Sequence, residues 1–183
     1  MKIAFTGSHG VGKTTIIKLL EKRLGTNNSV NVTREIPRII CYLVNNPEYF
    51  RRSQNTLVKQ MIILLGQLTQ EHELANTEYL ICDRTIFDHW AYTTYLFSDE
   101  LTEDYKITCE EFQKSHMKTY DKIFYIPIEF DVEDDGTREN DKSFQKEIDK
   151  IIVENLEKHK IEFITIGGTI EDRYNQIINN IGL

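Results

Sequence analysis

The chain has 183 residues and a mass of 21.5 kDa, a size that fits one domain. Its 40% hydrophobic and 28% charged residues are ordinary for a globular protein, which excludes the disordered, collagen-like and coiled-coil classes. With 22 basic and 29 acidic residues the formal net charge is −7, and this disfavours a nucleic-acid partner, because such proteins usually carry a basic face.

The cysteines and the apolar runs indicate the compartment. Cys41, Cys82 and Cys109 are odd in number and show no CxxC spacing, so neither a disulfide framework nor a zinc site is indicated. No apolar run approaches the roughly 18 to 20 residues that span a bilayer. The N-terminal segment lacks the pattern of a secretory signal. We therefore expect a cytoplasmic protein without a membrane partner.

Short apolar runs alternate with helical patterns along the chain. The first part predicts a strand at 2–6, a helix at 13–24, a strand at 30–33, a helix-prone segment broken around Pro37 and Pro47, and a helix at 57–75. The second part predicts strand 79–82, helices 86–97 and 110–118, strand 123–126, an acidic loop at 130–142, helix 148–159, strand 163–166 and helix 170–181. Five strands separated by helices predict an α/β fold over residues 1–183, a single domain with a five-stranded parallel sheet and helices on both faces. Ligands of such sheets bind beyond the carboxyl ends of the strands.

The segment after the first strand matches GxxxxGK[ST] at every fixed position: Gly7, Ser8, His9, Gly10, Val11, Gly12, Lys13 and Thr14. A strand precedes it and a helix follows, which is the setting of a phosphate-binding loop. Glycines let backbone N–H groups approach phosphate oxygens, and the helix N-terminus adds its positive dipole. We expect Lys13 to reach the β- and γ-phosphates and Thr14 to ligate Mg²⁺. Thr15 is either a second hydroxyl at the phosphates or the next helical residue, and His9 is expected to be exposed rather than catalytic. The motif predicts that the chain binds a nucleoside triphosphate.

Charged residues follow the second and third strands. Glu35 is placed to accept a proton from an attacking hydroxyl or to hold a metal-bound water, or else it only begins a helix. Arg38 is a candidate contact to substrate or phosphate, with a solvated side chain as the alternative. Asp83 closes the third strand where an Mg²⁺-binding or proton-accepting carboxylate is expected, and it can also cap the next helix. Arg84 offers a guanidinium fork that matches phosphate.

The helix predicted after the third strand places Asp88, Tyr92 and Tyr95 on one face, at i, i+4 and i+7. These side chains are candidates for holding a base and a sugar, although aromatic residues at helical spacing more often belong to a core. Arg51 and Arg52 are either exposed or part of an acceptor site.

The acidic segment at 131–142 has two interpretations. Composition alone favours an exposed loop. Its place opposite the phosphate loop favours a lid, in which Arg138 reaches the transferring phosphoryl group and closure excludes water.

With these residues in place, the chain resembles the P-loop kinases of the nicotinamide riboside kinase (NadR-like) family, which are close to nucleoside and nucleotide kinases. The matching segments cover nearly the whole chain: FTGSHGVGKTT, TREIPR, YLICDR, YDKIFYIPIEFDVEDDGTREND and GGTIEDRYNQII. The resemblance implies the strand order of nucleotide kinases, Mg-ATP as donor, Asp83 and Glu35 near the metal and the acceptor, and Arg138 in the lid. No adenylyltransferase or regulator segment precedes these motifs, and the acceptor does not transfer with the fold.

The leading interpretation is an ATP- and Mg²⁺-dependent kinase. It would transfer the γ-phosphoryl group to a nucleoside, to a nucleotide or to a related riboside such as nicotinamide riboside, with Lys13, Arg138 and Arg84 stabilising the transferring oxygens. One alternative is a P-loop ATPase or switch, although the Asn-Lys-x-Asp element of GTPases is missing. Another is a kinase of DNA or RNA ends, for which Arg34, Arg38, Arg51 and Arg52 form the one basic cluster in the sequence. Whether the protein is a homodimer stays open.

Overall fold

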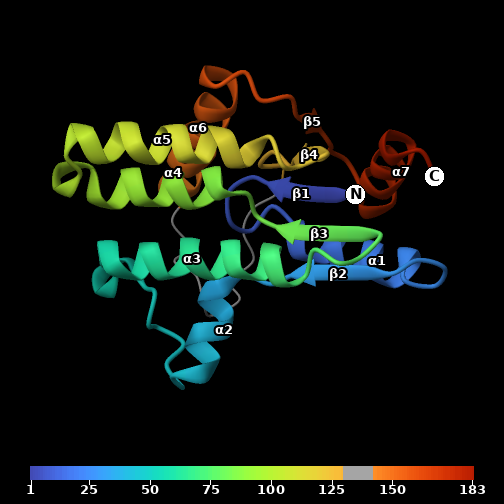
Figure 1. Cartoon of the computed structure of the whole chain (residues 1–183), viewed down its shortest axis with the longest axis horizontal. Coiled ribbons are helices and arrows are strands. Elements are labelled where there is room, and N and C mark those ends of the chain that lie inside the picture. The colour runs from blue at the N-terminus through green and yellow to red at the C-terminus, as the bar shows by residue number, and fades with distance from the viewer. Residues whose placement is uncertain (130–141) are drawn as a thin grey trace.

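A computed structural model describes residues 1–129 and 142–183 and shows a parallel β-sheet covered by helices (Figure 1). The strands are β1 (Lys2–Thr6), β2 (Val30–Thr33), β3 (Tyr79–Asp83), β4 (Lys122–Tyr125) and β5 (Ile164–Thr165). Their order in the sheet is β2-β3-β1-β4-β5, and every neighbouring pair is parallel. The predicted α/β fold with a five-stranded parallel sheet is confirmed.

The helices lie between the strands in sequence and pack on both faces of the sheet. They are α1 (Lys13–Leu24), α2 (Ile36–Leu43), α3 (Leu57–Glu73), α4 (Ile86–Phe97), α5 (Glu103–Met117), α6 (Lys142–Lys158) and α7 (Ile170–Ile181). Two short 3₁₀ turns, Arg52–Gln54 and Ser98–Glu100, complete the described elements. Within the described ranges, no helix combines the length and the apolar character needed to cross a bilayer.

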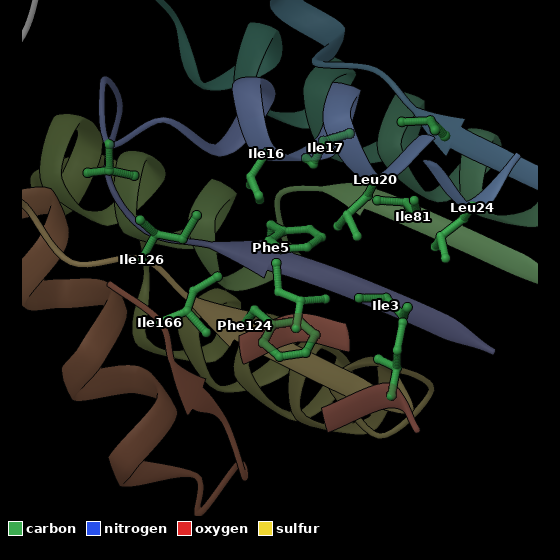
Figure 2. Packing of buried hydrophobic residues seen from close by; sticks show 14 residues of the cluster. Ile3, Phe5, Ile16, Ile17, Leu20, Leu24, Ile81, Phe124, Ile126 and Ile166 are labelled. Atoms are coloured by element: carbon green, nitrogen blue, oxygen red, sulfur yellow. The ribbon is translucent and has the colours of Figure 1, made fainter. Parts of the chain in front are cut away.

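Side chains of β1 alternate between two buried layers, as the two-residue period of a strand requires. Ile3 and Phe5 pack with α1 and α7 on one face, and Ala4 packs with α4, α5 and α6 on the other. The rings of Phe5 and Phe124 stack with their centroids 5.5 Å apart. Figure 2 shows these rings among the isoleucine and leucine side chains of the first layer. The helices on both faces are therefore held by two separate apolar layers.

Several boundaries differ from the sequence prediction. Helix α5 begins at Glu103 instead of 110, because Thr102 caps it by accepting a hydrogen bond from the Tyr105 N–H. Helix α6 begins at Lys142, inside the segment predicted as a loop. Pro37 does not break α2 but lies in its first turn, where the missing N–H costs nothing. The rest of the predicted lid, residues 131–141 with Arg138, lies outside the described residues.

A buried polar cluster lies between α3, α5 and the start of β1. Glu71 accepts hydrogen bonds from Gln67 Nε2 (2.6 Å) and the Tyr120 hydroxyl (2.8 Å), and it pairs with Lys2 Nζ (2.8 Å) and His116 Nε2 (2.7 Å). Burial alone would raise the pKa of Glu71, but the hydrogen bonds of His116, Lys2 and Gln67 outweigh it and lower that pKa to about 2. The cluster fixes α3, which carries part of the site described next.

The strand order places three chain segments at one edge of the sheet. Strands β2, β3 and β1 are neighbours, with Thr33 opposite Cys82 and Phe5 opposite Asp83. The residues that follow these strands therefore meet at the carboxyl edge, which is where parallel sheets hold their ligands.

Candidate active site

The loop between β1 and α1 has the backbone of a phosphate cradle. Gly7, Gly10 and Gly12 have φ angles of 135°, 79° and 91°, a region that residues with a Cβ rarely adopt. A Cβ on Gly7 would lie 2.5 Å from the carbonyl oxygen of Ile126. Gly12 is the N-cap of α1, so the unpaired N–H groups of the first helical turn face the loop. This geometry fits a polyphosphate.

Lys13 lies folded across this loop. Its Nζ donates to the carbonyl oxygens of Gly7 (2.7 Å) and Ser8 (2.6 Å), and the side chain is buried. Burial, together with the charge of Arg84, lowers the pKa of Lys13 to about 7. An anion next to Nζ would offset both effects, so the lysine also fits a phosphate ligand.

A candidate cation site lies beside the phosphate loop. The Thr14 hydroxyl donates to Asp83 Oδ2 at 3.0 Å. Asp83 is only 4% exposed, and its Oδ1 has no hydrogen-bond partner within residues 1–129 and 142–183. Burial and the neighbouring charge of Glu35 raise the pKa of Asp83. A buried carboxylate oxygen without a partner beside a threonine hydroxyl fits the donor set of Mg²⁺.

This candidate cation site has few side chains that can ligate a metal. Among the described residues, no group of three histidine, cysteine, aspartate or glutamate side chains is arranged to hold a metal ion. A cation at Thr14 and Asp83 would take its other oxygen ligands from water or from a bound nucleotide.

Arg84, which follows β3, contacts Glu35, which follows β2. Its Nε and Nη2 lie 3.0 and 2.9 Å from Glu35 Oε1, and its Nη1 lies 3.4 Å from Asp88 Oδ1. The second oxygen of Glu35 accepts from Arg38 Nε at 2.7 Å. Both oxygens of Glu35 thus contact guanidinium groups, and the pair Glu35–Arg84 is almost completely buried.

The backbone of Arg84 is strained. Its φ of +95° belongs to the left-handed region, which costs a non-glycine residue about 1–3 kcal/mol. The conformation is held by hydrogen bonds from the Arg84 N–H to the Phe5 carbonyl (3.1 Å) and from Gln67 Nε2 to the Arg84 carbonyl (3.3 Å). In this conformation the guanidinium of Arg84 contacts Glu35.

Asp88 corrects one sequence-based expectation. Its carboxylate is fully buried and accepts from the Thr6 hydroxyl (2.8 Å) and from the N–H (2.8 Å) and hydroxyl (2.7 Å) of Thr85. It caps α4 in a capping box and lies 3.4 Å from the Gly7 N–H. Asp88 does not line the cavity described below, so direct substrate contact is not supported. It instead positions Arg84 and the start of the phosphate loop.

A cavity of about 560 Å³ opens beside the phosphate loop. Five residues predicted at the site line it, and these are His9, Glu35, Arg38, Arg84 and Tyr92. Arg51 and Arg52 line it as well, whereas Arg34 pairs with Glu21 (2.8 Å) elsewhere. Its volume is in the range of small-molecule sites.

His9 corrects a second expectation. The side chain is buried, 5% exposed, and its Nδ1 lies 3.0 Å from the Tyr92 hydroxyl. Its ring centroid is 5.4 Å from that of Phe144, and Gln145 Nε2 donates to its carbonyl at 2.7 Å. Helix α6 therefore covers the loop position that was expected to be exposed. His9 joins the phosphate loop to the cavity wall.

The two remaining predicted positions lie outside the cavity lining. Thr15 is exposed on the first turn of α1, which agrees with an ordinary helical residue. Tyr95 packs on Phe144 with centroids 5.1 Å apart. Of the aromatic face expected on this helix, Tyr92 is the member that reaches the cavity.

Sequence reasoning missed Arg173 and most of the cavity wall. Arg173 on α7 donates from Nη1 to the Val11 carbonyl (2.8 Å) in the phosphate loop and from Nη2 to Glu129 (2.8 Å) after β4. It lies within the matching segment GGTIEDRYNQII, but its role could not be read there, because its contact lies 162 positions away in sequence. The missed wall residues include Cys41, Phe50 and Phe144. None of the three directly follows a predicted strand, so the positions of the strand ends did not indicate them.

Comparison with known families gives the relationship of the chain. A family model described as an AAA domain matches residues 2–173. The chain belongs to this AAA domain family. No curated protein matches it.

Solved structures of similar fold are nucleoside and nucleotide kinases and NadR. The AAA domain is similar to deoxyadenosine kinase from M. mycoides with bound dATP, at 19% identity and a TM-score of 0.71 over 100% of both chains. It is similar to thymidylate kinase from Ehrlichia chaffeensis, at 20% identity and a TM-score of 0.65 over 99% of this chain and 98% of that one. It is also similar to NadR protein in complex with NR, at 17% identity and a TM-score of 0.74 over 98% of this chain and 50% of that one. At these identities the likeness shows the fold, which is the P-loop kinase-like fold predicted from the resemblance.

Proposed function

We propose that this protein is an ATP- and Mg²⁺-dependent kinase that transfers the γ-phosphoryl group to a nucleoside, a nucleotide or a related riboside. The supporting observation is one juxtaposition: a phosphate loop with Lys13 and the Thr14–Asp83 pair lies beside a cavity edged by Glu35 and Arg84. The cavity gives a second molecule, the acceptor, a place next to the donor. Structures of similar fold that are named as kinases, one with bound dATP, support the same proposal.

On the donor side, the loop N–H groups and the N-terminus of α1 hold the phosphates, and Lys13 neutralises the γ-phosphoryl oxygens. Thr14 and Asp83 would hold Mg²⁺, which would neutralise the charge that develops during the transfer. Arg173 holds the phosphate loop in place by its hydrogen bond to the Val11 carbonyl.

On the acceptor side, Arg84 stabilises the transferring oxygens, and Glu35 holds Arg84 and Arg38. With a hydroxyl acceptor, Glu35 or Asp83 receives its proton. With a phosphate acceptor no proton must leave, and both carboxylates serve positioning. Arg138 as a lid residue remains a prediction, with the expectation that Arg138→Ala lowers kcat more than nucleotide affinity.

The alternatives have weaker support. An ATPase or switch has no use for an acceptor cavity of this size. A kinase of DNA or RNA ends needs a basic track for the backbone, yet Arg38, Arg51 and Arg52 converge on a cavity and Arg34 pairs with Glu21. The proposal of one domain over residues 1–183 is supported by the packing of α7 against α1, near the two ends of the chain.

The test measures ADP release from Mg-ATP with and without nucleosides, nucleoside monophosphates and nicotinamide riboside, with the product identified by mass. Stimulation by an acceptor together with a phosphorylated product is expected. Lys13→Ala should abolish transfer, and Lys18→Ala, an exposed lysine on the same helix, is the matched control. ADP release that no acceptor changes would refute the kinase and favour an ATPase.

A further inference from the structure

The acceptor cavity is lined by more arginines than carboxylates. Among the described residues that line it there are four arginines, Arg38, Arg51, Arg52 and Arg84, and one carboxylate, Glu35. The chain as a whole has a formal net charge of −7. An acidic protein that gathers arginines around a single cavity concentrates anions there.

The four arginines come from two parts of the fold, three of them from the stretch between β2 and α3. Arg84 follows β3, Arg38 lies on α2, and Arg51 and Arg52 lie between α2 and α3. Their convergence therefore does not follow from one basic run in the sequence. Guanidinium groups bind phosphate through two parallel N–H···O bonds, a geometry that lysine lacks.

Aromatic rings support the guanidinium groups. Arg52 lies over the ring of Phe144 with its Cζ 4.9 Å from the centroid, and Arg84 lies over Tyr92 at 5.4 Å. Phe50 also lines the cavity. Flat rings and guanidinium groups on the walls of one cavity fit a ligand that has both an aromatic ring system and an anionic group.

We propose, on the basis of the kinase function above, that the acceptor is already phosphorylated: a nucleoside monophosphate that receives the γ-phosphoryl group on its phosphate. An oxygen of the acceptor phosphate forms the new P–O bond, and the bond between Pγ and the β,γ-bridging oxygen breaks. The products are ADP and a nucleoside diphosphate. A dianionic acceptor has no proton to give up, so no base is needed.

The contacts of Glu35 agree with this choice. Its oxygens accept from Arg84 at 2.9 Å and from Arg38 at 2.7 Å. A carboxylate held in this way orients two phosphate-binding guanidinium groups, and we assign Glu35 a positioning role.

The first experiment compares each nucleoside with its own 5′-monophosphate as acceptor, at saturating Mg-ATP. The expected preference in kcat/KM for the monophosphate is about 100-fold or more, because a site built for a charged group is left unpaired by the neutral analogue. Preference for a nucleoside would overturn this proposal and leave the kinase function intact. ADP release without any acceptor would overturn both.

The second experiment changes the arginines one at a time. Arg38→Gln and Arg51→Gln should each raise KM for the monophosphate about tenfold and leave KM for Mg-ATP unchanged. Arg34→Gln, whose side chain pairs with Glu21 outside the cavity, is the matched control and should change neither. An equal loss with nucleoside and monophosphate would show that these arginines do not read the phosphate.

A third experiment needs no knowledge of the acceptor. Cys41 lines the cavity, Cys109 does not, and Cys82 is buried. The ratio of the alkylation rate with the anionic iodoacetate to that with the neutral iodoacetamide reports the local electrostatic potential at a cysteine. This ratio is measured for Cys41 in the Cys109→Ser variant and for Cys109 in the Cys41→Ser variant. We expect a ratio about tenfold higher at Cys41, reduced by Arg51→Gln. A ratio at Cys41 no higher than at Cys109 would mean that the cavity does not attract anions, and the proposal would fail.

Discussion

Binding of a triphosphate should draw a proton onto Lys13. In the structure, burial and the charge of Arg84 lower the pKa of Lys13 to about 7, so about half of the molecules carry an uncharged amine at neutral pH. Phosphate oxygens beside Nζ favour the charged form and return this pKa toward its ordinary range. The expected uptake therefore rises with pH across neutrality, toward one proton per chain at pH 8 and above.

Calorimetry measures this uptake directly. A non-hydrolysable ATP analogue is titrated in two buffers of equal pH and different ionisation enthalpy, and the difference in observed heat gives the proton number. Lys18→Ala, an exposed lysine on α1, should behave as the wild type. Saturable binding at about pH 8 without proton uptake would refute the account of Lys13.

The same shift predicts how stability changes with pH in the absence of nucleotide. Since the pKa of Lys13 is lower in the folded chain than the 10.5 of an ordinary lysine, the unfolded chain binds more protons between about pH 7 and 10.5. The free energy of unfolding should therefore gain from this group as pH rises through that window, by up to about 5 kcal/mol. Bound nucleotide should remove this rise in the free energy of unfolding. Urea titrations at several pH values, with and without nucleotide, measure it.

Four further predictions test the fold and the loop by substitution. Glu71→Gln should make stability less sensitive to acid. The lowered pKa of Glu71 stabilises the fold by about 3 kcal/mol above about pH 4.5, and this contribution is lost as pH falls toward 2. The free energies of unfolding measured in urea at pH 7 and at pH 3 should therefore differ less in the variant than in the wild type. Phe5→Ala should lower the free energy of unfolding by about 3–5 kcal/mol, and a loss below 1 kcal/mol would contradict its place in the core. Arg173→Gln should weaken ATP binding about tenfold in a titration, whereas Glu171→Gln on the same helix, which breaks an exposed pair, should not. Arg84→Gly should be more stable than Arg84→Ala by about 1 kcal/mol, because glycine adopts a positive φ without strain. Both variants should lose phosphoryl transfer. Equal stability of the two would show that this backbone is not strained.

The sequence predicted the sheet and the phosphate loop because both are local patterns. Each strand is a short apolar run, and the glycines of the loop stand at fixed spacing before Lys13. Helix ends were less predictable: α5 starts directly after a capping threonine, Thr102, within a polar stretch where no apolar period marks the beginning.

The cavity could be predicted only in part. Strand ends located Glu35 and Arg84, since topology brings the residues after parallel strands together. The role of Asp88 could not be read from its helical spacing, because its partner Thr6 lies 82 positions away. His9 was expected to be exposed for a similar reason, since the helix that covers it begins more than a hundred residues later in the chain.

The outer wall of the cavity has an evolutionary consequence. Pro37, Arg38, Cys41, Phe50 and Asn55 all belong to one continuous stretch between β2 and α3, and none of them contributes to the sheet. Mutations in this stretch can change which acceptor is chosen while the strands, the phosphate loop and Asp88 keep the donor half intact. Selectivity in this fold can therefore diverge faster than architecture, and exchange of residues 37–55 between distant homologues is a direct route to new acceptors.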